Sequence, residues 1–316
     1  LEEHWWETGA ATEFRRYRPT VDAVLDWFDR KVGPEGLVVD VGHWDFADWV
    51  PAWDERAGVP FAVDQGPSAL HNLVYAAALR SAACMMRETG RDAVAMEYLD
   101  RAGRILTAVD RLCWFEEDGL FGEGPGIRDF SQHTQVWAVL SGLAAGERAR
   151  RVMTGALHRP GLYACTFPWM FAMFRALETA GLYAETDALW DMWRGLPALG
   201  LTTIPEMPVN TRSDCHAWGA LPLWEFPRKV LGIQPAVPGW KTILIEPKAM
   251  FLQDASGEAI TPHGPVFVSW KRDEMGFSLA CRLPEGVPAE IRLPDGSVHA
   301  VSSDAERTQK VTCPFH

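Results

Sequence analysis

Apolar residues recur at spacings of three and four from residue 12 to about residue 232, and this periodicity restricts the fold more than any other feature. Such spacing places apolar side chains on one face of an α-helix. One periodic run stops before Gly33-Pro34, and a second run, 68–88, is followed almost at once by a third, 92–112. Glycine and proline at these breaks are typical of helix ends. Further helical segments are expected at 131–144, 147–157, 166–180, 182–195 and 214–231.

The expected helices form close pairs, with short turns inside each pair and longer loops between pairs. This arrangement is typical of stacked helical hairpins. Because the chain has no repeat signature of an open helical solenoid, a closed ring of hairpins fits better. In a closed ring the longer loops gather at one end, where they can line a pocket.

After Pro235 the pattern changes to short runs of β-type residues bounded by Gly, Pro and Asp turns. We expect these runs to form a small antiparallel β-sandwich packed on the helical domain. The segment 234–239 interrupts the helical pattern with two prolines and a glycine. It sets the expected boundary between a helical domain, 1–234, and the β-sandwich, 235–316. The expected strands are 241–245, 266–270, 277–280, 290–293 and 298–301.

With 47% hydrophobic and 23% charged residues, the composition of this 316-residue chain is that of a folded globular protein. The formal net charge of −12 argues against a nucleic-acid partner, because affinity for nucleic acid depends on clustered Lys and Arg. No apolar run approaches the roughly 18 residues of a membrane span, and no signal segment opens the chain. We therefore expect neither a nucleic-acid nor a membrane partner, and a cytoplasmic location.

The six cysteines are scattered singly, without a CxxC pair or zinc spacing. The motifs of serine nucleophiles, phosphate-binding loops, HExxH metal sites and dinucleotide sites are absent. Cys215 and His216 do not form a catalytic dyad, because adjacent residues of a helix diverge by about 100°. The expectation is reduced thiols, no cofactor and no metal, which leaves carboxylates as candidates for the chemistry.

The segment 42–53 interleaves aspartates with indoles between two expected helices, in a chain that has 15 tryptophans. Trp44 and Trp49 can stack on a sugar ring while Asp48 accepts hydrogen bonds from sugar hydroxyls. Alternatively, the segment is a loop plug in which Asp45 or Asp48 caps a helix. Both interpretations stay open at this point.

A second polar group, 129–135, lies at the start of an expected helix, with Asp129 or Ser131 as its N-cap. His133 and Gln135 either face the interior of the ring, where they can contact a ligand, or are satisfied structural residues. The sequence leaves both alternatives open.

A third stretch, 202–219, is broken by prolines and gathers acidic, basic and aromatic residues just before an apolar run. Because Glu206 follows Pro205, its backbone is expected to be extended or turned rather than in the middle of a helix, and its side chain projects from a loop. A general base needs such a carboxylate beside a water molecule. Asp214 is expected to cap a helix that carries His216 and Trp218. The alternative for Glu206 is a solvated loop acid.

At these residues the sequence resembles the α-L-rhamnosidases of glycoside hydrolase family 78. Their Gly-x-Thr-Thr-x-x-Glu element and the following Ser-x-Cys-His-x-Trp element are matched by 200–206 and 213–218. The resemblance covers nearly the whole chain in order, and this Glu-to-Trp block is its specific part. The further matches are 5–9, 44–49, 131–133 and 261–266.

The resemblance implies an (α/α)₆ six-hairpin barrel with a C-terminal β-sandwich, and inverting hydrolysis of terminal α-L-rhamnosides, with a small carbohydrate or rhamnosylated glycoside as substrate. Carried over, Glu206 would be the general base that activates water. The candidate substrate-binding residues would be Trp44, Asp48, Trp49, His133, His216 and Trp218. An inverting scheme also needs a second carboxyl group, about 6.5–9.5 Å away, that protonates the leaving oxygen.

In the family, the general acid lies in an Asp/Glu-Arg-x-Gly-x-x-Gly-Asp element upstream of a Trp-x-x-Thr-Gly element. This sequence departs from that pattern. The chain begins at the latter element, and the similar-looking 54–58 falls out of order. We therefore expect the N-terminal part of the barrel to lie outside these residues. We also expect the chain alone to have little hydrolytic activity. Its helices are expected to expose apolar faces, which would allow a homo-oligomer to form. Two alternatives are another (α/α)₆ glycosidase and a non-catalytic sugar-binding or scaffold protein that lacks the acid.

Overall fold

The computed structural model describes residues 1–207, 213–301 and 308–314. The chain divides into two compact units. One, which we call the helical unit, is Phe14–Gly219; the other, the β unit, combines Leu1–Glu13 with Ala220–His316. The boundary expected at 234/235 falls inside the β unit, because the short helices after residue 219 and the start of the chain belong with the strands.

The helical unit contains most of the periodic segments that the sequence predicts. Its longer helices are α2 (Thr12–Asp29, which begins just before the unit), α3 (Ala69–Glu88), α4 (Asp92–Cys113), α5 (Gln132–Leu140), α6 (Gly146–His158) and α7 (Phe167–Thr179). Its shorter elements are the 3₁₀ turns η1 (Pro51–Arg56), η2 (Phe61–Asp64), η3 (Tyr183–Glu185), η4 (Leu196–Leu199) and η5 (Ala217–Gly219), the helices α8 (Thr186–Leu189) and α9 (Asp191–Arg194), and the hairpin β1 (Trp114–Phe115) and β2 (Leu120–Phe121).

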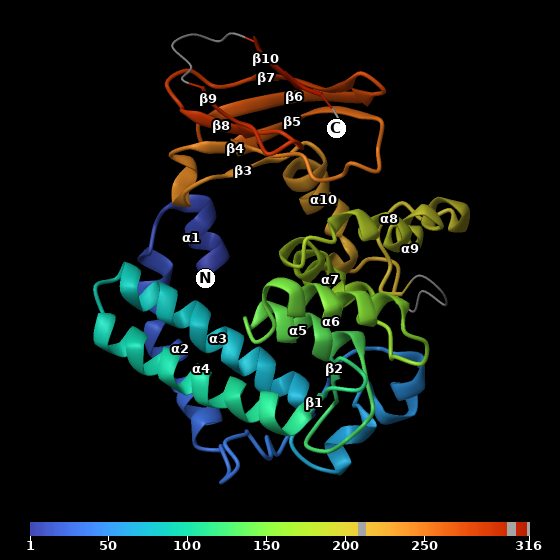
Figure 1. Cartoon of the computed structure of the whole chain (residues 1–316). Coiled ribbons are helices and arrows are strands. Elements are labelled where there is room, and N and C mark those ends of the chain that lie inside the picture. The colour runs from blue at the N-terminus through green and yellow to red at the C-terminus, as the bar shows by residue number, and fades with distance from the viewer. Residues whose placement is uncertain (208–212, 302–307, 315–316) are drawn as a thin grey trace. The chain divides into compact units, whose positions relative to one another are not determined.

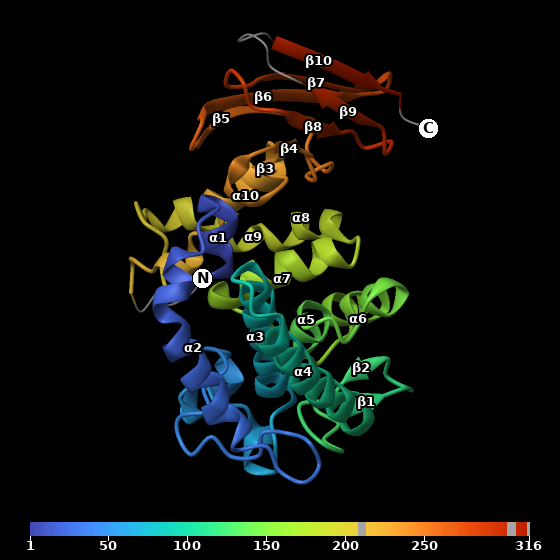
Figure 2. The ribbon, with the colours of Figure 1, turned by 90° about the vertical axis from the view of Figure 1, so that its left-hand side faces the viewer.

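Local signals place the helix starts. Ser68 caps α3 by accepting a hydrogen bond from the His71 backbone N–H, and Ser131 caps α5 by accepting one from the Thr134 N–H. Helices α3 and α4 lie side by side as a hairpin (Figures 1 and 2). Helix α5 contacts α3 and α7, and α6 packs on α5. Successive helices of the chain therefore pack as neighbouring hairpins, as the spacing of the expected helices indicates.

Two of the expected helices are wrong as continuous elements. The segment 182–195 is broken into η3, α8 and α9. The segment 214–231 consists of η5, the helix α10 (Leu221–Glu225) and a single π-helical turn, Phe226–Val230. Pro222 and Pro227 lie in the first turns of α10 and of the π-helical turn. Because proline lacks the N–H that a continuous helix needs at that point, each one starts a new element.

The β unit contains two four-stranded sheets, in the orders β10-β7-β6-β5 and β3-β4-β8-β9. The first sheet is antiparallel throughout. In the second sheet β4 pairs with β8 in parallel, which corrects the expectation of a purely antiparallel module. The strands are β3 (Ile233–Pro235), β4 (Ile243–Ile245), β5 (Asp254–Thr261), β6 (Gly264–Asp273), β7 (Gly276–Arg282), β8 (Ala289–Arg292), β9 (Val298–Val301) and β10 (Thr308–Cys313).

One buried apolar cluster takes side chains from both sheets, including Ile245 and Ile291 of one and Val268 and Trp270 of the other. Alternation along β6, where Val266, Val268 and Trp270 are buried, provides this face. The expected runs in β4, β6, β7, β8 and β9 are therefore strands, whereas β3, β5 and β10 were not anticipated.

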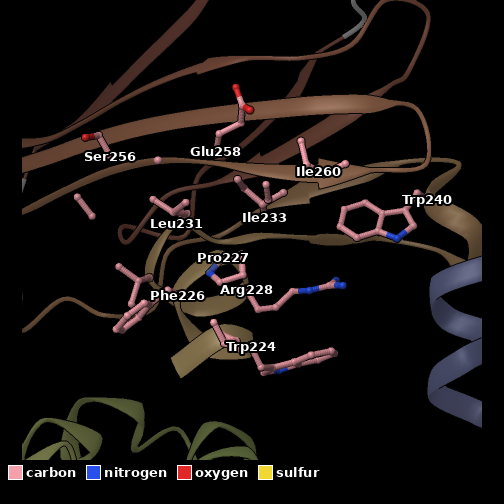
Figure 3. A pocket seen from close by; sticks show the side chains of 15 residues that line it. Trp224, Phe226, Pro227, Arg228, Leu231, Ile233, Trp240, Ser256, Glu258 and Ile260 are labelled. Carbon is pink, nitrogen blue, oxygen red and sulfur yellow. The ribbon is translucent and has the colours of Figure 1, made fainter. Parts of the chain in front are cut away.

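The helix α1 (Glu2–Thr8) belongs to the β unit, where its Glu7 carboxylate is held by an arginine and a tryptophan. The Arg228 guanidinium donates to the Glu7 carboxylate at 2.6 Å and lies 4.7 Å from the ring centres of both Trp224 and Trp240. The Trp240 indole N–H donates to the other oxygen of Glu7. Figure 3 shows the arginine side chain extending between the two indoles, in a cavity of about 640 Å³. These contacts explain why the start of the chain belongs with the β unit.

Candidate functional site

The loop that carries the first group of candidate residues is shaped by glycine. Gly58 has a positive φ of 79°, and its carbonyl accepts hydrogen bonds from the backbone N–H groups of Ala47 and Asp48. A Cβ atom at Gly58 would approach the Phe46 ring to 2.5 Å and the Asp48 carbonyl to 2.9 Å. Only glycine combines this backbone conformation with such a close approach. The backbone of the loop around Asp48 is therefore packed directly against the backbone of residues 57–59.

Asp48 is fully buried, with an exposed fraction of 0%. Its carboxylate accepts four hydrogen bonds: Oδ1 from the Trp49 N–H at 2.7 Å and the Thr166 hydroxyl at 2.5 Å, and Oδ2 from the Thr166 N–H at 2.8 Å and His133 Nε2 at 2.7 Å. Thr166 is the N-cap residue of α7. This geometry is that of the structural alternative, in which the aspartate fixes the loop to a helix N-terminus.

The indoles of the same loop are arranged differently. Trp44 is 61% exposed and donates its N–H to the Ala57 carbonyl at 3.0 Å. Its ring centre lies 6.2 Å from that of Trp49, and Phe46 lies against both rings. Trp44, Phe46 and Trp49 thus form a tilted aromatic cluster that offers one large indole face to solvent. Such a face can stack on a sugar ring.

His133 has no exposed surface and lies in a buried aromatic setting, 5.5 Å from the Trp53 ring centre and 5.2 Å from that of Trp169. Its Nε2 contacts Asp48, and its buried Nδ1 has no hydrogen-bond partner within the described ranges. Gln135 is also buried and bonds the backbone of Phe121 in both directions. Gln135 is therefore a satisfied structural residue, whereas His133 is held on one side by Asp48 and keeps one buried ring nitrogen without a partner among the described residues.

A buried acid near His133 was not anticipated from the sequence. Glu123 Oε1 accepts from the N–H and hydroxyl of Ser131 and from the hydroxyl of Thr134. Burial raises the pKa of Glu123, although these hydrogen bonds and the nearby His133 act in the opposite direction. The only signal in the sequence is the position of Glu123 in the Gly-rich turn before α5.

The structure places Glu206 in a loop, as its proline predicts, and buries it to 6% exposure. Its backbone N–H donates to the Ser213 carbonyl at 2.8 Å. The His216 N–H donates to the Ile204 carbonyl at 2.8 Å, and the Trp218 indole N–H to the Glu206 carbonyl at 3.3 Å. These backbone bonds join the two halves of the Glu-to-Trp block. The intervening residues 208–212, with Arg212 among them, lie outside the described residues.

His216 and Trp218 form one aromatic pair, with ring centres 4.4 Å apart. Trp218 is 36% exposed, and His216 Nδ1 is buried without a hydrogen-bond partner in the part of the chain that is described. The expected helix capped by Asp214 is not formed, because only the turn η5, Ala217–Gly219, is helical there. Backbone pairing with 204–206, rather than a helix, positions His216.

The candidate residues therefore form three sets: the aromatic cluster of Trp44 and Trp49, the buried pair of Asp48 and His133, and Glu206 with His216 and Trp218. The last two sets are each tied to α7. Asp48 bonds the N-cap residue Thr166, and η5 packs against α7. No group of three or more His, Cys, Asp or Glu residues in the described ranges could hold a metal ion. None of the described helices combines the length and hydropathy needed to cross a bilayer.

Comparison with known proteins gives consistent matches. Residues 232–308 match a family model described as the bacterial α-L-rhamnosidase C-terminal domain. The chain is 25% identical over 164 residues to an α-L-rhamnosidase of Streptomyces avermitilis, a match that covers 50% of this chain and 15% of that protein. It is 34% identical over 77 residues to an α-L-rhamnosidase of Alteromonas sp., covering 24% of this chain and 8% of that protein.

Solved structures extend the match over most of the chain. The family 78 rhamnosidase of Bacillus sp. GL1 superposes with a TM-score of 0.82 and 27% identity, covering 93% of this chain and 32% of that one. The α-L-rhamnosidase of Streptomyces avermitilis, solved with L-rhamnose, superposes with a TM-score of 0.75 at 18% identity, covering 98% and 32%. The chain thus spans about a third of these solved relatives. Together these matches show that the chain is similar to bacterial α-L-rhamnosidases over a portion of their length, and that residues 232–308 correspond to their C-terminal domain.

Proposed function

We propose that this chain is part of an inverting glycoside hydrolase that releases terminal α-L-rhamnose from rhamnosides, and that it supplies the general base and part of the sugar pocket. The observation that carries the proposal is the buried loop carboxyl Glu206, held by backbone bonds beside the aromatic pair of His216 and Trp218. The similarity to α-L-rhamnosidases supports the reaction class and the sugar.

The proposal includes an architecture. The neighbouring hairpins of the helical unit would be an arc of an (α/α)₆ barrel, and the two sheets of the β unit would be its C-terminal β-sandwich. The contacts of α5 with α3 and α7, and the apolar cluster shared by the two sheets, support this arrangement. In such a ring the loops before α5 and α7 and the Glu206 loop would share one end.

In the proposed reaction Glu206 removes a proton from a water molecule while that water attacks the anomeric carbon. The bond from this carbon to the leaving oxygen breaks, and a second carboxylic acid protonates the leaving oxygen. Burying a carboxylate costs free energy unless it is compensated. What distinguishes Glu206 from the structural acid Asp48 is its place beside the aromatic pair of His216 and Trp218. No residue of this chain is assigned as the acid.

The other candidates have separate tasks in this proposal. His216 and Trp218 contact the sugar from the side of the base, and Trp44 and Trp49 provide an apolar platform for the ring. Asp48 and His133 are positioning residues, because they fix the loop that carries the two indoles to the N-terminus of α7. Removing the side chain of Asp48 or of His133 would weaken sugar binding without removing a reacting group.

The sugar site can be tested by titrating the 316-residue chain with L-rhamnose in a calorimeter. We expect saturable binding that His216→Ala weakens at least tenfold, whereas Cys215→Ser, at an exposed neighbouring position, leaves it within twofold. Absence of L-rhamnose binding to the folded chain would overturn the proposed function.

The base assignment needs a hydrolytic readout. A chimera in which this chain replaces the matching third of the Bacillus sp. GL1 enzyme should hydrolyse an aryl α-L-rhamnoside and first release the β-anomer, as followed by proton NMR. Glu206→Gln should lower kcat by about 10²–10⁴-fold, with L-rhamnose binding to the isolated chain changed less than threefold. Turnover of the Glu206→Gln chimera equal to that of the parent chimera, or release of the α-anomer first, would contradict this mechanism.

A further inference from the structure

Strand β5 lies at one edge of the antiparallel sheet, next to β6. Thr261 and Gly264 are paired across a two-residue turn, and the closing pair of such a hairpin exchanges two backbone hydrogen bonds. Because hydrogen-bonded and non-hydrogen-bonded positions alternate along an antiparallel pair, every second residue before Thr261 directs its N–H and C=O away from β6. These outward residues are Ile260, Glu258, Ser256 and Asp254.

The outward backbone groups of β5 have no backbone partner elsewhere in the described part of the chain. The strand borders the cavity of about 640 Å³, which residues 255–260 line from one side and α10 and the π-helical turn from the other (Figure 3). Large apolar side chains are exposed here: Leu223 is 80% exposed, Phe226 53% and Ile260 76%. An unpaired strand edge beside exposed apolar groups is a template for a further strand.

The opposite edge of the same sheet is protected in a way that β5 is not. The two-residue turn between Asp273 and Gly276 fixes the alternation along β7, and through it the outward residues of β10, which include Lys310 and Thr312. An exposed lysine in the middle of an edge strand disfavours pairing with another chain. Strand β5 contains neither lysine nor proline.

The outward edge of β5 is complementary to itself. Two antiparallel copies related by a two-fold axis pair symmetrically about one residue, and opposite residues lie on the same face. Pairing centred on Gly257 sets Ser256 opposite Glu258 of the second copy and Asp254 opposite Ile260. All four outward residues of each strand then meet outward residues, which allows about eight backbone hydrogen bonds.

Charge selects this register over its neighbours. Pairing centred on Glu258 would set the two Glu258 carboxylates directly opposite each other, and pairing centred on Ser256 would set Glu258 opposite Asp254 of the second copy. Like charges directly opposite one another destabilise a strand pair. Registers centred nearer either end of β5 pair fewer outward residues. The register centred on Gly257 therefore combines the most backbone bonds with no facing like charges.

We propose that β5 is the interface of a homodimer, in which the β5 strands of two copies pair antiparallel about Gly257 and join their sheets into one. The contact is isologous, as in most two-subunit proteins. Leu223 and Phe226 flank the paired strands in each copy and supply apolar contact area. No residue assigned to the sugar site takes part, so the dimer is independent of the proposed function.

Sedimentation velocity of the 316-residue chain over a range of concentrations tests the dimer. We expect a monomer–dimer equilibrium that Ser256→Pro weakens at least tenfold. This change removes an outward N–H and leaves the bonds to β6 in place, and proline is tolerated at such edge positions. Lys310→Pro makes the same change at an outward N–H of β10 and is the matched control, which should leave the dimerisation constant within twofold. Far-UV circular dichroism checks that both variants are folded.

A charge switch at one exposed position tests the register. Because Ser256 faces Glu258 of the second copy, Ser256→Lys should strengthen the dimer about three- to tenfold and Ser256→Glu should weaken it by a similar factor. Amide hydrogen exchange of the unmodified chain gives a measurement that needs no variant. The amides of Ser256, Glu258 and Ile260 should exchange more slowly as the protein concentration rises, whereas those of Lys310 and Thr312 should not change.

Several results would overturn the assignment. One is a chain that stays monomeric from about 1 μM to about 1 mM. Another is a dimer in which Ser256→Lys and Ser256→Glu shift the equilibrium in the same direction, or in which the β5 amides gain no protection. A dimer that Val24→Glu abolishes and Ser256→Pro leaves intact would place the contact on the exposed face of α2 instead, since Val24 is 50% exposed there.

Discussion

Replacing Asp48 by alanine should cause the largest loss of stability among single substitutions in the candidate site. The carboxylate has no exposed surface and receives hydrogen bonds from Trp49, Thr166 and His133. The alanine variant leaves four donors without their acceptor: the buried His133 Nε2, two partly buried donors of Thr166 and the partly buried N–H of Trp49. A buried polar group without a partner costs far more than the bond itself contributes.

The magnitude follows from the burial of each donor. An unsatisfied buried group costs about 1–3 kcal/mol, with His133 toward the upper end and the partly exposed Thr166 and Trp49 groups at or below the lower end. The sum is about 3–5 kcal/mol, which agrees with the cost of about 3–5 kcal/mol for removing one partner of a buried pair. For a unit of roughly 150–250 residues, each kcal/mol lowers Tm by about 2–4 °C, so Tm of the helical unit should fall by about 6–20 °C.

Urea denaturation followed by tryptophan fluorescence and by far-UV circular dichroism measures this loss. Asp54→Ala, at an exposed position in the same loop region, is the control and should change stability by less than about 0.5 kcal/mol. Asp48→Asn should also be destabilising, because one of its two terminal atoms becomes a donor facing donors. A loss below about 1 kcal/mol for Asp48→Ala would refute the view that this carboxylate fixes the loop to α7.

Three further predictions concern other parts of the chain. Gly58→Ala should lower the free energy of unfolding by at least about 2 kcal/mol, as measured by urea denaturation, and should weaken L-rhamnose binding. Gly126 has a similar positive φ but open space around it, so Gly126→Ala should lower the free energy of unfolding by only about 1 kcal/mol. Because burial raises the pKa of Glu123 in the folded state, its contribution to stability is greatest below the unfolded pKa near 4.5 and is lost as pH rises through the folded pKa. Glu123→Gln should therefore gain stability relative to the unmodified chain between pH 5 and pH 8, and a parallel pH dependence of the two proteins would contradict this. Arg228→Lys should speed amide hydrogen exchange in α1 at least tenfold, with Arg292→Lys, an exposed arginine of the same unit, as a control that leaves α1 unchanged.

Much of the helical secondary structure is predictable because its signals are local. The apolar spacing and the serine cap that define α3 lie within the helix or next to it, so the expected segment 68–88 is confirmed as Ala69–Glu88 with Ser68 as its cap. The same holds for α4, expected at 92–112 and found at Asp92–Cys113. The loop position of Glu206 was also predictable, since the preceding proline disfavours a helix at that point.

Other elements depend on partners that are distant in sequence. The edge strands β5 and β10 have weak apolar patterns and exist because β6 and β7 offer them backbone partners. The parallel pairing of β4 with β8 joins segments about 45 residues apart, and strand direction has no local signal in the sequence. The apolar spacing of 214–231 predicted a helix, but two prolines and the pairing of His216 with Ile204 divide it.

The sequence by itself determined the residue types at the candidate site: a loop carboxyl at Glu206, aromatic residues around it, and the alternation of aspartates with indoles in 42–53. Only the tertiary structure decided which of these acids face inward as structural anchors. Asp48 is fully paired because His133 and Thr166, 85 and 118 positions later in the chain, are brought to its two oxygens. A carboxylate becomes a structural group or a reactive one through its burial and its donors, and those are set by residues that only folding brings together.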